Sequence, residues 1–317
     1  MARKVRRRKV KAGPAVTLAP AQLRFPGEVS HYWMAVSAVT WACVFLAVGG
    51  WFSTGHSAEN WQWAYLAAWP IGSILIVNWV SNRTRRQQLK QLGPSARVFG
   101  TNHQELGRHL KEVADLLGMR KLPAMFLVED DAPYLYAMAG GKGTIILTTA
   151  LVQLLRRDEL SVMLARELAH LKFSHVRLER ALHWLRTSPP IYNILLLPLC
   201  FWGVVMGPWL ELIEYTADRA AVLVTGSPNL VNATIVKLAA AADPQSGVTV
   251  DEIEDFLHQE RAAELDAGQM EAQFKLNRFV ESIPNLRDRI EQVSEFYQSD
   301  DAKQLLEKVA EVRGKVS

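Results

Sequence analysis

Two short stretches of this chain carry side chains whose types and spacing suit metal-assisted hydrolysis. The first runs from Arg166 to His170 in the order Arg-Glu-Leu-Ala-His. In a His-Glu-x-x-His helix, two histidines four residues apart share one face and bind zinc, while the glutamate polarises the attacking water. Here Glu167 and His170 occupy the positions of the base and the second ligand, but Arg166 stands where the first ligand belongs.

A third ligand would have to come from a later helix. Glu214 and Asp218 are four residues apart and therefore share a helical face. The permanently charged guanidinium of Arg166 would repel a divalent cation a few ångströms away. The same planar group could pair with Glu214 or Glu167 and link the two helices in place of the ion. We therefore predict a salt bridge where a metal would otherwise bind.

The order of these motifs resembles that of the HtpX-like and CAAX-processing membrane gluzincin metallopeptidases. That family has N-terminal spans, a small sheet, a zinc-binding helix, hydrophobic sequence and then Glu-x-x-x-Asp. The resemblance implies that Glu167 is the general base, actual or vestigial, and that His170 and Glu214 are residual ligand positions. It also implies that Arg166 replaces the first histidine ligand. Asp218 would then contact the ligands without binding the metal itself.

Two further places depart from the family pattern. The Asn-Ala of the family's edge strand is here Tyr136-Ala137, and with Met138 these residues form the expected peptide-binding edge strand. The family's Ser-His-Pro is here Ser-Ile-Pro at 282–284. Together with Arg166, these differences indicate that catalysis is impaired or lost.

The histidines allow two other interpretations. The run around His170 would also fit an ordinary helix with solvated charges and a packed histidine, but the downstream carboxylates favour a site. His175 could act as a substitute ligand. Five residues along a helix is about 140° around its axis, so we expect His175 to point away from His170 and to be structural.

The composition points to a membrane protein in a reducing compartment. The 317-residue chain has two cysteines, both in apolar stretches, which excludes a disulfide framework. Its formal charge is +4, and seven Lys and Arg residues lie within the first eleven positions. We interpret residues 1–30 as a basic, mobile leader on the cytoplasmic side that contacts lipid and not nucleic acid.

Two apolar runs, Trp33 to Phe52 and Trp61 to Val80, are each long enough to cross a bilayer as a helix. They predict a transmembrane hairpin within residues 31–82. The link between them lacks Lys and Arg, whereas both outer flanks are basic. This asymmetry predicts a multi-pass protein of the bacterial inner membrane, with the N terminus and the main domain in the cytoplasm.

Residues 83–317 are expected to form one cytoplasmic, gluzincin-like domain. Apolar residues at helical spacing predict a helix over 101–119, and short β-type runs predict strands at 124–129, 134–138 and 144–148. Helical patterns follow to the C terminus, so the fold class is mainly α with a small β-sheet, α+β and zincin-like. The apolar stretch 191–213, interrupted by Pro198 and Pro208, is expected to be re-entrant or membrane-associated, because a single crossing would separate His170 from Glu214. The alternative is a true third span, which would place Glu214 on the other side of the membrane and destroy the site.

These features predict a membrane-anchored metallopeptidase homologue that is catalytically impaired or inactive and binds membrane proteins or extended peptides. In this interpretation no cofactor is expected. One alternative is an active zinc endopeptidase in membrane protein quality control, with Glu167 as general base. A second alternative is a structural subunit of a larger membrane complex.

Overall fold

The computed structural model describes residues 20–53, 103–179, 205–242 and 286–316, with scattered positions between 72 and 98. The leader up to residue 19, most of the predicted second span and most of the stretch 191–213 lie outside the described residues, as does the Ser-Ile-Pro segment.

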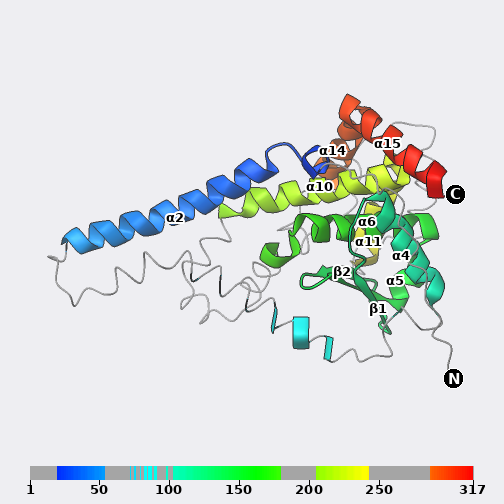
Figure 1. Ribbon diagram of the computed structural model, residues 1–317, viewed down its shortest axis with the longest axis horizontal. Helices are drawn as coiled ribbons and strands as arrows, with labels where there is room; N and C mark the ends of the chain where they lie inside the picture. The colour runs from blue at the N-terminus through cyan, green and yellow to red at the C-terminus, as the bar shows by residue number, and fades with distance from the viewer. Residues whose placement is uncertain are drawn as a thin grey trace, which may run out of the picture.

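Helix α6 (Arg157–Phe173) lies at the centre of the domain, between helix α10 (Gly207–Thr225) and the sheet (Figure 1). Its sequence explains this position, because residues on most sides of α6 are apolar and buried. The backbone N–H of Arg156 donates to the Glu159 carboxylate at 2.8 Å, which satisfies a free donor at the start of the helix. Helix α6 ends at Ser174, whose φ of 65° is left-handed.

The sheet has three strands in the order β1-β3-β2. Strand β1 (Ala124–Val128) pairs in parallel with β3 (Thr144–Thr148), and β2 (Leu135–Met138) pairs antiparallel with β3. Strand β3 is buried along its whole length, as expected of a central strand. The small sheet predicted from the sequence is therefore present, and β2 is one of its edge strands.

Four further helices pack around α6 and α10, a short one packs against β3, and together they complete the hydrophobic core. They are α4 (Gln104–Leu116), α5 (Thr149–Leu154), α11 (Pro228–Ala242), α14 (Leu286–Gln298) and α15 (Asp300–Val316). In Figure 1, α14 and α15 lie at one end of α10. This architecture confirms the mainly α prediction with a small mixed sheet.

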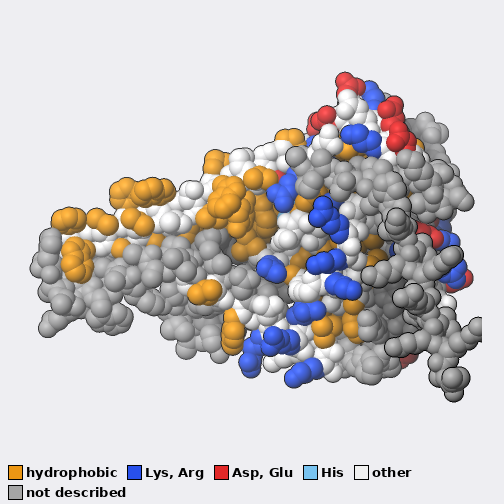
Figure 2. All heavy atoms as spheres, viewed as in Figure 1, with side chains coloured by type: hydrophobic (Ala, Val, Ile, Leu, Met, Phe, Trp, Pro, Cys, Tyr) orange, Lys and Arg blue, Asp and Glu red, His pale blue; other side chains and the backbone are white. Residues whose placement is uncertain are grey.

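Helix α2 (Glu28–Ser53) extends from the domain as a stalk (Figure 1). Its 26 residues span about 39 Å, and it is the one helix among the described residues that is long and apolar enough to cross a membrane. Small residues four apart, such as Val39 and Cys43, pack against the first turns of α10. The outward-facing large side chains, including Trp41 and Phe45, are apolar, and Figure 2 shows this apolar surface along the stalk.

Two segments differ from the expectations above. Residues 20–30 were predicted to belong to a mobile leader, but Pro20–Leu23 form helix α1, Leu23 is buried in the core and α2 begins at Glu28. A single apolar side chain can dock such a segment without any periodic pattern. Pro208 was predicted to interrupt the stretch 191–213, but it lies in the first turn of α10, where proline is tolerated.

Candidate functional site

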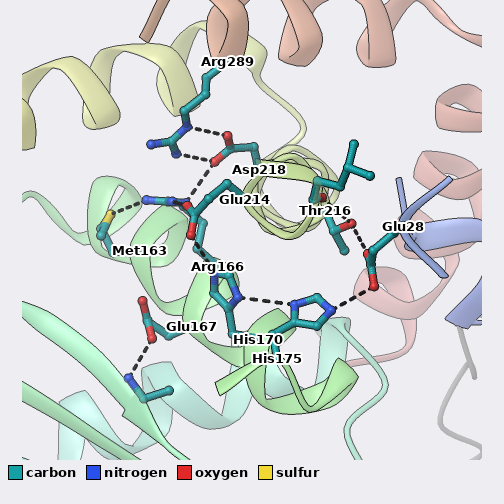
Figure 3. A network of polar contacts seen from close by, with 12 residues as sticks. Glu28, Met163, Arg166, Glu167, His170, His175, Glu214, Thr216, Asp218 and Arg289 are labelled. Atoms are coloured by element: carbon teal, nitrogen blue, oxygen red, sulfur yellow. Dashed lines mark hydrogen bonds and ion pairs between the residues drawn. The ribbon is translucent and has the colours of Figure 1, made fainter. Parts of the chain in front are cut away.

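Arg166 on α6 reaches across to two successive turns of α10 (Figure 3). Its Nη2 lies 2.5 Å from Oε2 of Glu214, and its Nε lies 2.9 Å from Oδ1 of Asp218. The Nε contact is an ion pair and not a well-directed hydrogen bond. All three side chains are largely buried, with exposed fractions of 11%, 14% and 1%. Of the two partners that the sequence left open for Arg166, Glu214 and Glu167, the structure pairs it with Glu214.

Asp218 is held by a second arginine. Arg289 of α14 donates from Nε and Nη2 to the two carboxylate oxygens of Asp218, at 2.8 and 2.7 Å. Burial alone would lower the pKa of Arg289, but the Asp218 carboxylate more than offsets this effect and raises the pKa. The contact is thus a buried, bidentate ion pair that links α14 to α10.

His170 lies beside the same cluster, with Nε2 3.6 Å from Oε1 of Glu214. Burial lowers the pKa of His170 to about 4, against the attraction of the Glu214 carboxylate. Burial alone would raise the pKa of Glu214, but the charge of Arg166 and the other cations nearby lower it to about 2. At neutral pH, His170 is therefore uncharged while Glu214 is ionised.

His175 corrects the sequence-based expectation. Its Nδ1 lies 3.3 Å from Nδ1 of His170, whereas continued helix geometry would have turned it away. The reason is Ser174, whose left-handed backbone ends α6 and folds the next residue back, so that the His175 N–H donates to the His170 carbonyl at 3.0 Å. The His175 imidazole thus contacts the site.

A buried polar chain runs from the site to the start of α2. Nε2 of His175 lies 3.0 Å from Oε1 of Glu28, and the Thr216 hydroxyl donates to Oε2 of Glu28 at 2.5 Å. These contacts join α2, the end of α6 and α10 (Figure 3). Glu28 and Thr216 were not predicted as part of the site. The available signal was the position of Glu28 at the start of an apolar helix, because a carboxylate buried there needs a hydrogen-bond partner.

Glu167 points to the sheet and not to Arg166. Its Oε2 accepts a hydrogen bond from the backbone N–H of Ala137 at 2.7 Å. Tyr136, Ala137 and Met138 all lie in the edge strand β2, beside α6. The structure therefore gathers Arg166, His170, Glu214 and Asp218 in one cluster and places Glu167 at its border with β2.

The side chains present do not fit a zinc ion. Zinc sites combine neutral imidazoles with anionic ligands around an open tetrahedron. Here the Glu214 and Asp218 carboxylates are ion-paired with guanidinium groups, and the Arg166 group lies between α6 and α10. Within the described ranges, no three His, Cys, Asp or Glu side chains are grouped to hold a metal.

Residues 101–296 match the sequence model of the family described as peptidase family M48. This segment includes all of α6, α10 and the sheet. The chain belongs to peptidase family M48. The resemblance to HtpX-like metallopeptidases inferred from the motifs is thereby confirmed.

Two curated relatives indicate how far the similarity of this M48 chain extends. Plastoglobule-localized metallopeptidase 48, chloroplastic, from Arabidopsis thaliana is 31% identical over 161 residues, which is 48% of this chain and 44% of that protein. A Protease HtpX homolog from Helicobacter pylori is 30% identical over 118 residues, 36% of this chain and 37% of that protein. The chain thus matches less than half the length of each relative. No solved structure matches it.

Proposed function

We propose that this M48 chain is a membrane-anchored pseudopeptidase, in which the Arg166 guanidinium replaces the metal and the retained site binds an extended segment of a membrane protein or peptide. The observation that carries the proposal is the contact of Arg166 with both Glu214 and Asp218. Because one charged group already pairs with the side chains that would face a metal, the two helices are linked without an ion.

Electrostatic repulsion prevents the Arg166 guanidinium and a zinc ion from occupying the cluster together. A dication within about 4 Å of a guanidinium is repelled by roughly 8 kcal/mol at an effective dielectric constant of about 20. Arginine does not lose its charge in proteins, so protonation cannot relieve this repulsion. Either Arg166 leaves the cluster or the cluster contains no zinc.

The environment of Glu167 supports the same conclusion. A general base must lie within hydrogen-bond reach of the proton that it takes. The Glu167 carboxylate instead accepts a hydrogen bond from the Ala137 N–H at 2.7 Å, and so fastens α6 to β2. This role requires a hydrogen-bond acceptor but no proton transfer.

Binding of an extended chain is supported by the position of β2 at the sheet edge beside α6. Edge strands bind peptides through main-chain hydrogen bonds, without any reaction. A peptide that pairs with β2 would compete with Glu167 for the Ala137 N–H. We therefore propose that binding displaces Glu167 from this donor.

The proposed location is the bacterial inner membrane, with the main domain in the cytoplasm. The exposed apolar surface of α2 supports anchoring, since an aqueous environment would disfavour side chains such as Trp41 and Phe45, which are 62% and 72% exposed. The basic residues that flank the predicted spans support the cytoplasmic orientation.

The second candidate is an active zinc endopeptidase. It is favoured by the retention of Glu167, His170 and Glu214 close together in the structure. In that case Arg166 would have to turn out of the cluster when the metal binds.

Zinc content and proteolysis of the purified full chain distinguish the two candidates. After incubation with zinc and removal of excess metal, the parent chain should retain no stoichiometric zinc and should not cleave casein. Arg166→His should gain zinc, because it restores the missing imidazole. Arg157→His is the matched control, since Arg157 is exposed on the same helix. Cleavage by the parent chain that disappears in Glu167→Gln would refute the pseudopeptidase and establish the active enzyme.

A further inference from the structure

A pocket with a volume of about 570 Å³ adjoins the candidate site but shares none of its charged residues. It is formed where the end of α4, the turn between β2 and β3, and the end of α6 meet. Five of its lining residues are basic, and none of the described lining residues is acidic. The basic residues are Arg120, Lys121, Lys142, Lys172 and Arg177.

A sixth cation lies over the turn between β2 and β3. The turn contains Gly140, where a Cβ atom would lie 2.7 Å from Nη1 of Arg85. The missing side chain thus allows the Arg85 guanidinium to rest directly on the backbone. Its Nε is buried and has no hydrogen-bond acceptor in the described part of the chain.

The lining of the pocket also contains apolar residues. Leu171, Val176 and Met119 contribute carbon surface between the basic groups. Lys172 is already oriented, because its Nζ donates to the Leu117 carbonyl at 2.6 Å. A ligand that combines an anionic oxygen cluster with a short apolar portion would satisfy both kinds of surface.

The pocket borders the segments that are expected to enter the membrane. Arg177 lines the pocket, and the next residue, Leu178, packs against the cluster formed by α2 and α10. Arg85 follows the end of the second apolar run by five residues, and the guanidinium of its neighbour Arg83 lies 5.4 Å from the ring of Trp79. Figure 2 shows Lys and Arg side chains gathered on the face at the foot of the apolar stalk.

We propose that this pocket binds the phosphate group of an anionic membrane phospholipid. Arginine and lysine pair strongly with phosphate oxygens, and basic groups beside a membrane segment attract anionic lipid. The apolar surface accommodates the first methylene groups of its acyl chains. This inference rests on the membrane anchoring proposed above, but not on the loss of zinc.

The test uses the full chain purified in a neutral detergent and native mass spectrometry with added phosphatidylglycerol or phosphatidylcholine. The parent chain should retain phosphatidylglycerol preferentially. The double variant Arg120→Glu with Lys142→Glu should bind it at least about 25-fold more weakly, from the loss of two basic groups. Both positions are exposed. The control, Lys303→Glu with Lys308→Glu, makes the same charge change on α15, outside the pocket, and should bind as the parent does.

Several outcomes would overturn the inference. One is an unchanged preference for phosphatidylglycerol in the pocket variant, or an equal loss in the control. Another is binding of inorganic phosphate as tight as that of the lipid, which would identify the source as free phosphate. If charge reversal lowers the yield, Lys121→Gln with Lys142→Gln serves in its place.

The inference and the proposed function can fail separately. Casein cleavage by the parent chain would refute the pseudopeptidase without affecting lipid retention in the pocket variants. Release of the parent chain from membranes by alkaline carbonate would refute the anchoring, and with it the lipid pocket, while the zinc result would still stand.

Discussion

Replacing Arg166 with methionine should destabilise the domain by about 3 kcal/mol. The change keeps the length of the apolar stem but removes the charge that faces Glu214, whose side chain is only 14% exposed. Breaking a buried ion pair by removing one partner costs about 3–5 kcal/mol, because the remaining charge is left uncompensated.

The depressed pKa of Glu214 indicates a stabilisation of similar size, in which burial is opposed by Arg166 first and by His170 and Arg289 after it. Its pKa falls from an ordinary value of 4.5 to about 2 in the folded chain. Each pKa unit corresponds to ~1.4 kcal/mol, so the ionised form is favoured by about 3 kcal/mol. Because the folded pKa is depressed, this stabilisation is fully present above pH 4.5 and is lost as the pH falls toward 2.

The assay is equilibrium unfolding of the full chain in detergent at neutral pH, for Arg166→Met, Glu214→Gln and the double variant. The double variant should recover part of the loss, since no unpaired carboxylate remains. The control is Arg157→Met on the same helix, which removes an exposed ion pair to Glu112 and should cost at most about 1 kcal/mol. A loss in Arg166→Met no larger than in this control would refute the role of Arg166 as the link between α6 and α10.

Two further predictions concern the histidines and the start of α2. Lowering the pH from 6.5 toward 4 should destabilise the parent chain by up to about 3 kcal/mol, because the pKa of His170 is about 4 when folded and 6.5 ordinarily, so the unfolded chain takes up the proton first. His170→Asn should flatten the unfolding free energy over this interval, whereas an unchanged pH profile would contradict the buried, neutral histidine. Glu28→Leu should weaken the docking of α2 by about 1–3 kcal/mol, since it removes the acceptor of His175 and Thr216. Faster hydrogen exchange at the end of α6 would show this, and protection equal to the parent's would exclude it.

The strands and helices around the site could be predicted from the spacing of apolar and polar residues along the sequence. The predicted strand at 144–148 coincides with β3, and the strand predicted at 134–138 differs from β2 by one residue. The pair of Glu214 and Asp218 shares a face because α10 is regular between them, and the spacing of four holds only in a regular helix. Local rules thus sufficed where the backbone stays regular.

The site features that were missed depend on irregular or distant contacts. His175 was misplaced because Ser174 adopts a left-handed conformation, which non-glycine residues seldom adopt and which no neighbouring residue signals. The partners Glu28 and His175 are 147 residues apart, and Arg289 and Asp218 are 71 apart. Composition indicates that a buried charge needs a partner, but only the packing of the helices selects which one.

Charge balance explains how the carboxylates of a metal site can persist in this chain. Arg166 and Arg289 contribute two positive charges, which match the negative charges of Glu214 and Asp218, while His170 is neutral. Arg166→His removes one positive charge and leaves a buried net charge of −1, which favours a bound cation. Zinc at 100 times its dissociation constant would then stabilise that variant by about 2.7 kcal/mol. The parent cluster is already neutral, so its melting temperature should not respond to zinc.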